Sequence, residues 1–255
     1  MTNAVVKHFV ITGCARSGTG YTAELLTRLG LTTEHETVFS PYTEAFPGWG
    51  AAAGESSWLA APFIHQLPPG TVVLHQLRHP DADVRSLLGI HFFDREVSQV
   101  TRDVRSLLQV ARARGLGGLS RRLLSGQWRG RGRRLRSDFV GFVERHCPEV
   151  FERDDELERC ETYWLRWNGL VEEQASQAEV AYKRYRIEEL DADLVMELLD
   201  LLGEPLEKDA VVAALDALPT SVNTRPTTLH PGPSERVSSE LVAAARRYGY
   251  DMDQG

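Results

Sequence analysis

Phe9-Val-Ile-Thr-Gly-Cys-Ala-Arg-Ser-Gly-Thr-Gly20 is the stretch of the chain that decides its fold. Its first four residues form a short apolar run, which is typical of a buried strand. The residues that follow are mostly small and rich in glycine, as in a tight loop. Residues 21–29 then place three leucines on one helical face, and a glycine follows them. The stretch therefore predicts a strand, a loop and a helix, in that order.

The same order of elements recurs along the chain. Residues 72–77 form an apolar run after a Pro-Pro-Gly turn, and a helix that starts with acidic residues is expected over residues 81–88. Further on, the patterns predict a long helix at 156–177, a strand at 180–187 and a helix at 189–202. Strands that alternate with helices imply a parallel sheet with helices on both faces. The predicted fold class is therefore a three-layer α/β fold.

The composition supports a single globular domain over residues 1–255. Hydrophobic residues make up 42% of the chain and charged residues 25%, which excludes the disordered and fibrous classes. No run approaches the roughly 18 consecutive apolar residues of a membrane span, and the N-terminus lacks the pattern of a signal peptide. The three cysteines contain no CxxC pair, so neither a disulfide framework nor a zinc site is expected. We expect a cytoplasmic protein without stable membrane insertion.

Residues 91–147 lack strand patterning and are interpreted as a mainly helical insertion. Residues 112–136 contain nine Arg and no acidic residue, so in a chain of net charge −7 the remainder carries −16. This segment could bind an anionic acceptor or an acidic membrane, or pair with the acidic stretch at 149–161. Arg/Gly-rich segments also bind single-stranded nucleic acid, but no stacking platform accompanies this one and the chain as a whole is acidic. We expect no nucleic-acid partner.

The loop after the first strand lies where backbone N–H groups and a helix N-terminus converge, which is typical of a phosphate site. Gly13 and Gly18 keep the Gly-x4-Gly spacing of nucleotide triphosphatases, but Thr19 and Gly20 stand where those enzymes need Lys and Ser or Thr. Arg16 supplies a planar, bidentate cation that suits an oxyanion held without a metal. The loop thus favours phosphate or sulfonate binding without triphosphate hydrolysis. The alternative is a glycine-rich turn with Arg16 in a surface salt bridge.

This loop resembles that of a known family. Between a strand and a helix, Arg16-Ser-Gly-Thr19 resembles the 5′-phosphosulfate loop of sulfotransferases that use 3′-phosphoadenosine 5′-phosphosulfate (PAPS). The resemblance implies a P-loop-like sulfotransferase architecture, with PAPS as the donor and no metal. The residues that it implies for binding the 5′-phosphosulfate are Arg16, Ser17, Gly18, Thr19, Gly20 and Tyr21.

A second signature of that family is an Arg at a strand end, a Pro two residues later and a Ser eight residues after the Arg. Arg78, Pro80 and Ser86 match this spacing. A helix that enters just after Arg78 would bring the Ser86 hydroxyl back beside the guanidinium, so that two donors hold one phosphate. The resemblance implies that Arg78 and Ser86 bind the 3′-phosphate. The alternative is a strand-end Arg and a solvated helix Ser.

Three weaker resemblances lie further along the chain. Residues 185–190 resemble the family's strand-end Arg-Tyr-Glu-Asp-Leu element, although Ile187 stands where the family frequently has Tyr. Residues 163–168 resemble the aromatic helix that often precedes this element, and core packing is the alternative for these aromatic side chains. The short segment that ends at Arg225 resembles the late loop that closes over the 3′-phosphate, with a plain surface loop as the alternative.

The candidate base lies in Glu34-His35-Glu36, which follows the first helix where the second strand should end. The carboxyl ends of parallel strands share one edge of a sheet, so this segment should lie on the same side as the phosphate loop. Sulfotransferases commonly place a Glu or His base in this region. Glu36 is the favoured base and His35 the second candidate, while a solvated acidic loop is the alternative to both.

These observations together predict a metal-independent sulfotransferase. It would transfer a sulfuryl group from PAPS to a hydroxyl or amine of a small-molecule or carbohydrate acceptor, with Arg16 and either Glu36 or His35 in the catalytic roles. The acceptor would be anionic if the Arg-rich segment binds it. Two alternatives remain open: a nucleotide kinase of P-loop type, against which the absence of Lys at position 19 argues, and a non-catalytic nucleotide-binding interaction protein.

Overall fold

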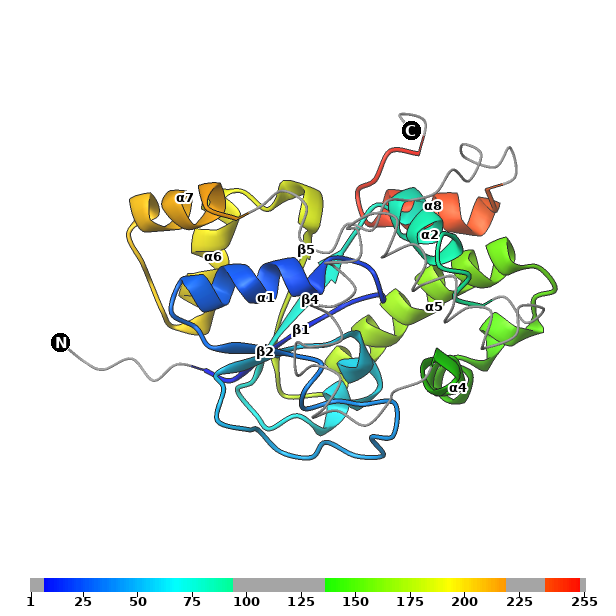
Figure 1. Cartoon of the computed structure of the whole chain (residues 1–255), viewed down its shortest axis with the longest axis horizontal. Helices are drawn as coiled ribbons and strands as arrows, with labels where there is room; N and C mark the ends of the chain where they lie inside the picture. The colour runs from blue at the N-terminus through cyan, green and yellow to red at the C-terminus, as the bar shows by residue number, and fades with distance from the viewer. Residues whose placement is uncertain (1–6, 94–135, 219–236, 253–255) are drawn as a thin grey trace, which may run out of the picture.

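The computed structural model describes residues 7–93, 136–218 and 237–252. Residues 112–135 of the Arg-rich segment, and the loop that contains Arg225, lie outside these ranges. The described residues form a five-stranded sheet with helices on both faces (Figure 1). This arrangement confirms the α/β fold class that the sequence predicts.

The sheet is parallel throughout. Its strands are β1 (Phe9–Thr12), β2 (Thr33–His35), β3 (Gly54–Ser56), β4 (Val72–Leu77) and β5 (Ala181–Arg186). They lie in the order β2-β3-β1-β4-β5. Periodicity predicts β1, β4 and β5 closely, because these strands carry apolar or alternating runs. It misses β3, because this strand is only three residues long and holds a glycine and two polar residues.

One face of the sheet is covered by α1 (Thr19–Arg28), α6 (Ala192–Leu202) and α7 (Lys208–Asp216), as Figure 1 shows. Alternate residues of β1 and β4 point into this layer, where they pack against the apolar faces of the helices. Asp191 caps α6 by accepting a hydrogen bond from the Leu194 N–H. This helix therefore begins three residues later than its periodicity predicts.

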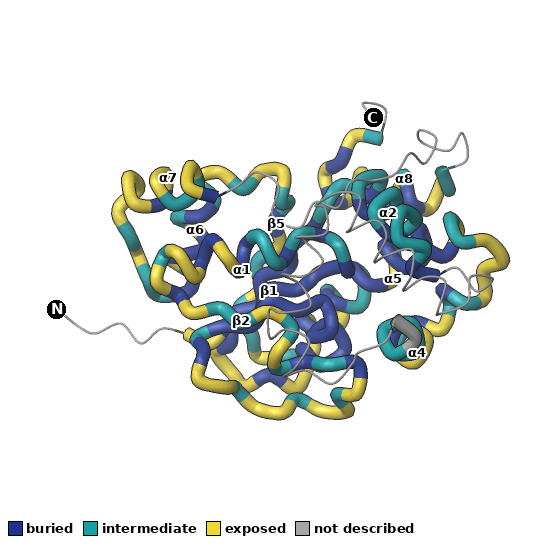
Figure 2. The backbone as a smooth tube through the Cα atoms, viewed as in Figure 1, coloured by how far each residue is buried: buried dark blue, intermediate teal, exposed yellow. Residues whose placement is uncertain are grey.

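The opposite face carries the larger helical layer. Its elements are η1 (Trp58–Gln66), α2 (Pro80–Leu88), α4 (Arg136–His146), α5 (Glu156–Ser176) and α8 (Ser239–Arg247). The other set of alternating residues from β1 and β4, including Val10 and Val73, packs here. The three inner strands, β1, β3 and β4, are buried, whereas most residues of the edge strands β2 and β5 are partly or fully exposed (Figure 2). Within the described ranges, no helix combines the length and apolar character needed to cross a bilayer.

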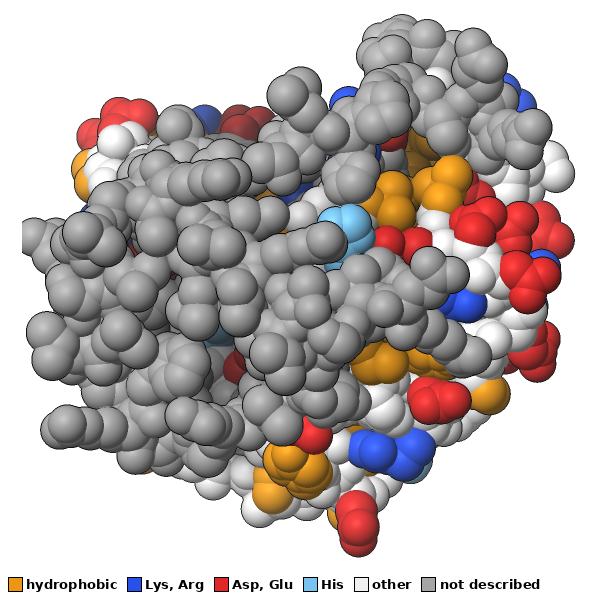
Figure 3. Space-filling view, turned by 45° about the vertical axis from the view of Figure 1, so that its right-hand side comes forward, with side chains coloured by type: hydrophobic (Ala, Val, Ile, Leu, Met, Phe, Trp, Pro, Cys, Tyr) orange, Lys and Arg blue, Asp and Glu red, His pale blue; other side chains and the backbone are white. Residues whose placement is uncertain are grey.

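Helix α4 occupies the C-terminal part of the predicted insertion, whose residues 94–135 lie outside the described ranges. The acidic stretch at 149–161 lies in the short η3 turn (Pro148–Glu152) and the beginning of α5. Acidic side chains recur along the described surface at the right of Figure 3. The predicted pairing of this stretch with the Arg-rich segment involves residues 112–135, which lie outside the described ranges.

The connections of the sheet diverge at β1 and β4, which are hydrogen-bonded neighbours. After β1 the chain passes through α1 to β2 at one edge, and after β4 it continues to β5 at the other edge. In open α/β sheets, ligands bind beyond the carboxyl ends of the strands at such a point of divergence. The loops that contain Arg16 and Arg78 follow these two strands, so the fold brings them to the same place.

Candidate anion-binding site

The loop of residues 13–18 connects β1 to α1 and presents backbone donors. Gly18 is the N-cap of α1, with a φ of 91°, and as a glycine it supplies no side-chain cap to this helix. The first N–H groups of a helix have no acceptor within the helix, so this end of α1 carries a partial positive charge beside the loop. Arg16 also has a positive φ, 80°, which is uncommon for a residue other than glycine. The loop backbone therefore has the character of an anion site.

Gln76 of β4 holds this loop in place. A Cβ atom at Gly13 would lie 2.1 Å from the Gln76 carbonyl oxygen, so only glycine allows the loop to pack this closely on β4. The Gln76 side chain donates from Nε2 to the Ser17 carbonyl oxygen at 2.7 Å. Its Oε1 accepts hydrogen bonds from the hydroxyls of Thr22 and Tyr185, each at 2.6 Å. These three buried hydrogen bonds fix the loop relative to the sheet.

Tyr163 of α5 supports the loop from the opposite layer. Its hydroxyl accepts a hydrogen bond from the Ala15 N–H at 2.9 Å, and its ring is fully buried. Burial raises the pKa of Tyr163, so the hydroxyl stays neutral. Core packing was one interpretation of this aromatic helix, and Tyr163 combines it with a hydrogen bond to the loop. Tyr163 lies in the segment 163–168 that resembles the family's aromatic helix, but the resemblance does not assign it this hydrogen bond. Gln76 is not among the predicted site residues, and its local signal is a polar residue inside a strand that is otherwise largely apolar.

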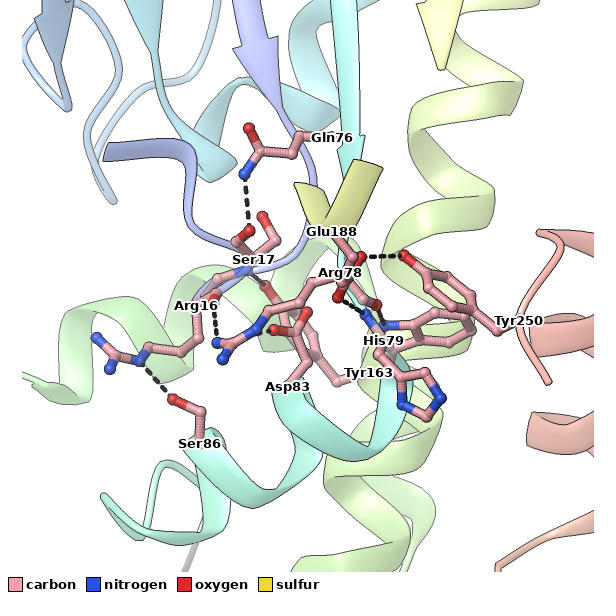
Figure 4. A network of polar contacts seen from close by, with 12 residues as sticks. Arg16, Ser17, Gln76, Arg78, His79, Asp83, Ser86, Tyr163, Glu188 and Tyr250 are labelled. Carbon is pink, nitrogen blue, oxygen red and sulfur yellow. Dashed lines mark hydrogen bonds and ion pairs between the residues drawn. The ribbon is translucent and has the colours of Figure 1, made fainter. Parts of the chain in front are cut away.

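The two signature segments contact each other (Figure 4). Arg16 donates from Nε to Ser86 Oγ at 2.9 Å, and Arg78 donates from Nη1 to the Arg16 carbonyl oxygen at 3.0 Å. Within the described ranges, the side chain of Arg16 thus bonds a hydroxyl, and no carboxylate forms a salt bridge with it. Ser86 was expected beside Arg78. It bonds Arg16 instead, because the guanidinium of Arg78 turns toward the loop carbonyl and toward the Asp83 carboxyl, 3.7 Å away.

The remaining residues of the predicted phosphate loop lie at the start of α1. The Ser17 Oγ is buried and has no hydrogen-bond partner among the described residues. Thr19 is buried, and Gly20 is partly buried in the first turn. The Tyr21 N–H donates to the Gly18 carbonyl at 2.8 Å, and the Tyr21 ring packs against the layer of α1, α6 and α7. Ser17 therefore offers an unused hydroxyl, whereas Tyr21 belongs to the helix and its core.

The element at residues 185–190 closes one side of the site. The Glu188 carboxylate, in the short η4 turn (Ile187–Glu189), accepts hydrogen bonds from the His79 N–H at 2.7 Å and the Tyr250 hydroxyl at 3.1 Å. A Cβ atom at Gly18 would lie 3.6 Å from Cγ1 of Ile187, so this side chain lies beside the start of α1. Segments far apart in the sequence therefore meet around the loop that contains Arg78 (Figure 4).

The site has the chemistry of an anion site: two Arg, an unpartnered hydroxyl and a helix N-terminus. No family model, no curated protein and no solved structure matches this chain. Among the described residues, no three His, Cys, Asp or Glu side chains gather in a way that could hold a metal ion. The interpretation of the site therefore depends on its own residues and their geometry.

Both candidate bases lie at the carboxyl end of β2. His35 is exposed, and its Nδ1 lies 2.9 Å from the Ser56 carbonyl oxygen. The Glu36 N–H donates to the same oxygen at 3.0 Å, and Glu36 has a φ of 51°. Burial lowers the pKa of Arg16, while the negative charges of Asp83 and Glu36 act in the opposite direction. The Glu36 carboxylate is therefore within electrostatic reach of the phosphate loop.

A buried carboxyl, Glu55 of β3, lies next to these residues. Its Oε1 accepts a hydrogen bond from the Thr37 N–H at 2.8 Å, and its Oε2 has no partner among the described residues. Burial raises the pKa of Glu55 to about 7, and the charges of Glu34 and Glu36 act in the same direction. Sequence reasoning did not select Glu55, because β3 is too short to show a pattern. This side of the sheet edge is therefore acidic.

Proposed function

We propose that this protein is a PAPS-dependent sulfotransferase that acts on a hydroxyl or amine of a small-molecule or carbohydrate acceptor. The observation that carries the proposal is the contact between the two signature segments. Arg16 bonds Ser86, and Arg78 bonds the backbone of Arg16, beyond the carboxyl ends of two neighbouring strands. Segments that resemble the two phosphate-binding elements of one family are thus adjacent in space, where that family would need them.

The residues present fit a donor with two phosphate groups. Three groups would hold the 5′-phosphosulfate: the buried Ser17 hydroxyl, which has no partner among the described residues, the guanidinium of Arg16, and the N–H groups at the N-terminus of α1. Arg78 and Ser86 would hold the 3′-phosphate, each exchanging its present protein partner for a ligand oxygen. The proposal includes a P-loop-like architecture. It is supported by the strand order β2-β3-β1-β4-β5, in which the phosphate-type loop follows the central strand β1.

When bound, PAPS supplies the sulfuryl group: the acceptor oxygen or nitrogen bonds to sulfur as the bond from sulfur to the 5′-phosphate oxygen breaks. Glu36 takes the proton that the acceptor loses, because its carboxylate lies near Arg16 at the edge of the sheet. Arg16 and the N–H groups of the loop stabilise the negative charge that develops on the departing phosphate. Gln76 and Tyr163 keep these donors in position through their hydrogen bonds to the loop.

The test is calorimetric titration with 3′-phosphoadenosine 5′-phosphate (PAP) and, separately, with ATP and magnesium. We expect micromolar binding of PAP that does not depend on magnesium. Replacement Arg78→Ala should weaken PAP binding by roughly tenfold to a hundredfold, since a charge-assisted hydrogen bond contributes roughly 1.5–3 kcal/mol. The matched control is Arg28→Ala, at the far end of α1, where the Arg28 side chain pairs with Glu24 at the surface.

Two outcomes would contradict the proposal. Preference for ATP with magnesium would favour the nucleotide kinase, and binding of neither ligand would remove the nucleotide site altogether. Equal loss of PAP binding in Arg78→Ala and Arg28→Ala would show that the effect does not arise at the site. Circular dichroism of each variant separates a local loss of binding from unfolding.

A further inference from the structure

Asp83 is a buried carboxyl that the proposed reaction does not use. It lies on α2 and is fully buried, and within the described part of the chain neither of its oxygens has a hydrogen-bond partner. The Nη1 atom of Arg78 lies 3.7 Å from its Oδ1, which is ion-pair distance without a hydrogen bond. Buried polar groups in native proteins almost always have partners, and a buried carboxylate without them is costly. Its position against the anion site therefore calls for a functional explanation.

Charged and titratable groups from several elements face Asp83. Arg78 and Arg16 favour its charged form, whereas Glu188 of η4 disfavours it. Burial is the largest influence and raises the pKa of Asp83 to about 8. The neutral groups that feel its charge are Cys14 of the loop, Tyr163 of α5 and Tyr250 after α8. Burial raises the pKa of each of these three, which leaves Asp83 as the group of this set that titrates near pH 8.

We propose that Asp83 is a proton-linked counterion of the anion site, which takes up a proton when a phosphate-type anion binds to Arg16 and Arg78. The inference rests on the proposed function, because it assigns the anion to these two Arg. In the free protein Arg78 contacts Asp83 at 3.7 Å and the Arg16 carbonyl at 3.0 Å (Figure 4). A bound anion would interact with the same guanidinium and would place a second negative charge beside the buried carboxylate. Protonation of Asp83 removes the repulsion between the two negative charges.

The direction of the pH dependence follows from linkage. An anion beside Asp83 favours the protonated carboxyl, so ligand binding and proton binding support each other. Below about pH 7 Asp83 is already neutral in the free protein, and binding requires no proton. Above about pH 8 it is ionised, so binding must take up a proton and the affinity falls by up to about tenfold per pH unit. The second phosphate ionisation, near pH 6, is nearly complete at pH 8, so it contributes little to the expected loss of affinity between pH 8 and pH 9.

The experiment is calorimetric titration of PAP into the full chain at pH 7, 8 and 9, each in two buffers of different ionisation enthalpy. For the wild type we expect no proton uptake at pH 7, uptake that approaches one proton per ligand at pH 9, and an affinity threefold to tenfold lower at pH 9 than at pH 8. Replacement Asp83→Asn should abolish the uptake, make the affinity independent of pH and exceed the wild-type affinity at pH 9. The matched control is Asp81→Asn on the same helix, where Asp81 is partly exposed and pairs with Arg85.

Asp81→Asn should keep the pH dependence of the wild type. The inference is overturned if the wild type takes up no proton at pH 9, whether or not the variants fold. It is also overturned if Asp83→Asn takes up as many protons as the wild type. Either result leaves PAP binding, and hence the proposed function, intact. If PAP does not bind at any pH, the proposed function fails. Inorganic sulfate is then the probe, and its effect on thermal unfolding is measured at pH 7 and pH 9 against chloride of equal ionic strength. The inference is supported if stabilisation by sulfate weakens at pH 9 in the wild type but not in Asp83→Asn. Any other result overturns it.

Discussion

The carboxyl edge of the sheet has two sides, and each contains a buried carboxyl. On the side of β1 and β4, Asp83 faces Arg78, and on the side of β2 and β3, Glu55 lies near Glu34 and Glu36. Burial raises the pKa of both groups, to about 8 for Asp83 and about 7 for Glu55. The neighbours differ in sign, however: cations partly offset the effect on Asp83, and like charges add to the effect on Glu55.

Desolvation thus sets the direction of the pKa shift on both sides, while the charges of the neighbouring groups decide what each side can bind. Among the described residues no N–H donates a hydrogen bond to Asp83, and its nearest cation is Arg78 at 3.7 Å, so we expect an anion that attracts Arg78 to change the protonation of Asp83. Glu55 accepts the Thr37 N–H at 2.8 Å and faces no guanidinium at ion-pair distance among the described residues. This difference agrees with the proposed roles, in which the first side holds an anion and the second accepts a proton.

The largest effect that would test this division is expected at Glu36. Replacement Glu36→Gln should lower kcat for sulfuryl transfer about 10²–10⁴-fold, because it removes a general base, and should leave PAP affinity nearly unchanged. The measurement uses labelled PAPS with an acceptor found by screening, and His35→Gln is the control on the neighbouring residue. A greater loss in His35→Gln would move the base to His35. If neither variant changes the rate of an active wild type, the acidic side has no part in the chemistry.

An intermediate effect is expected in the pH dependence of stability. The folded pKa of Glu55, about 7, lies above its ordinary value of 4.5, so its contribution to stability is complete below pH 4.5 and is lost as the pH rises to 7. Relative to the wild type, Glu55→Gln should therefore gain about 3 kcal/mol of unfolding free energy between pH 4.5 and pH 7. Denaturant unfolding of both proteins at several pH values measures this difference, in which the titration of groups common to both proteins cancels.

The two buried carboxyls should differ in how they respond to ligand. Addition of PAP should leave the pH profile of the Glu55→Gln difference unchanged, because Glu55 lies outside the anion site. The corresponding profile for Asp83→Asn should shift with PAP. If both profiles shift alike, the two sides of the edge form one electrostatic unit and the comparison fails.

The smallest effect is expected at Tyr163, which joins the loop to α5. Replacement Tyr163→Phe leaves the buried Ala15 N–H without its acceptor and should lower the unfolding free energy by about 1–3 kcal/mol. PAP affinity should fall a few-fold, because the loop loses one of its supports. Tyr182→Phe is a matched control, since it removes a hydroxyl hydrogen bond to His75 away from the loop. Retention of full PAP affinity in Tyr163→Phe would show that Gln76 alone is sufficient to position the loop.

Much of the fold follows from local sequence. The apolar run of β1, the glycine-rich loop and the leucine spacing of α1 each depend on neighbouring residues, and the structure confirms all three. The boundaries depend on caps, which is why α6 begins after Asp191 and not at residue 189. The strand β3 cannot be predicted from local sequence, because its three residues have no apolar pattern. They form a strand only by pairing with β1 and β2 on either side.

The candidate site divides in the same way. Arg16, Arg78 and Ser86 could be selected from motif spacing, because the chemistry of a phosphate loop requires particular residues at short intervals along the chain. The sequence could not show that Ser86 bonds Arg16, since 70 residues separate the two and the bond depends on how α2 packs beside the loop.

The α/β class, the loop and the residue types at the sheet edge can therefore be predicted from sequence, because they depend on interactions between near neighbours along the chain. The tertiary structure decided the contacts made by Gln76, Tyr163 and Asp83, whose partners lie on other elements. It also decided which carboxyls are buried, and with them the two pKa values that distinguish the sides of the edge. Burial is a property of the packed molecule, and no local pattern of residues specifies it.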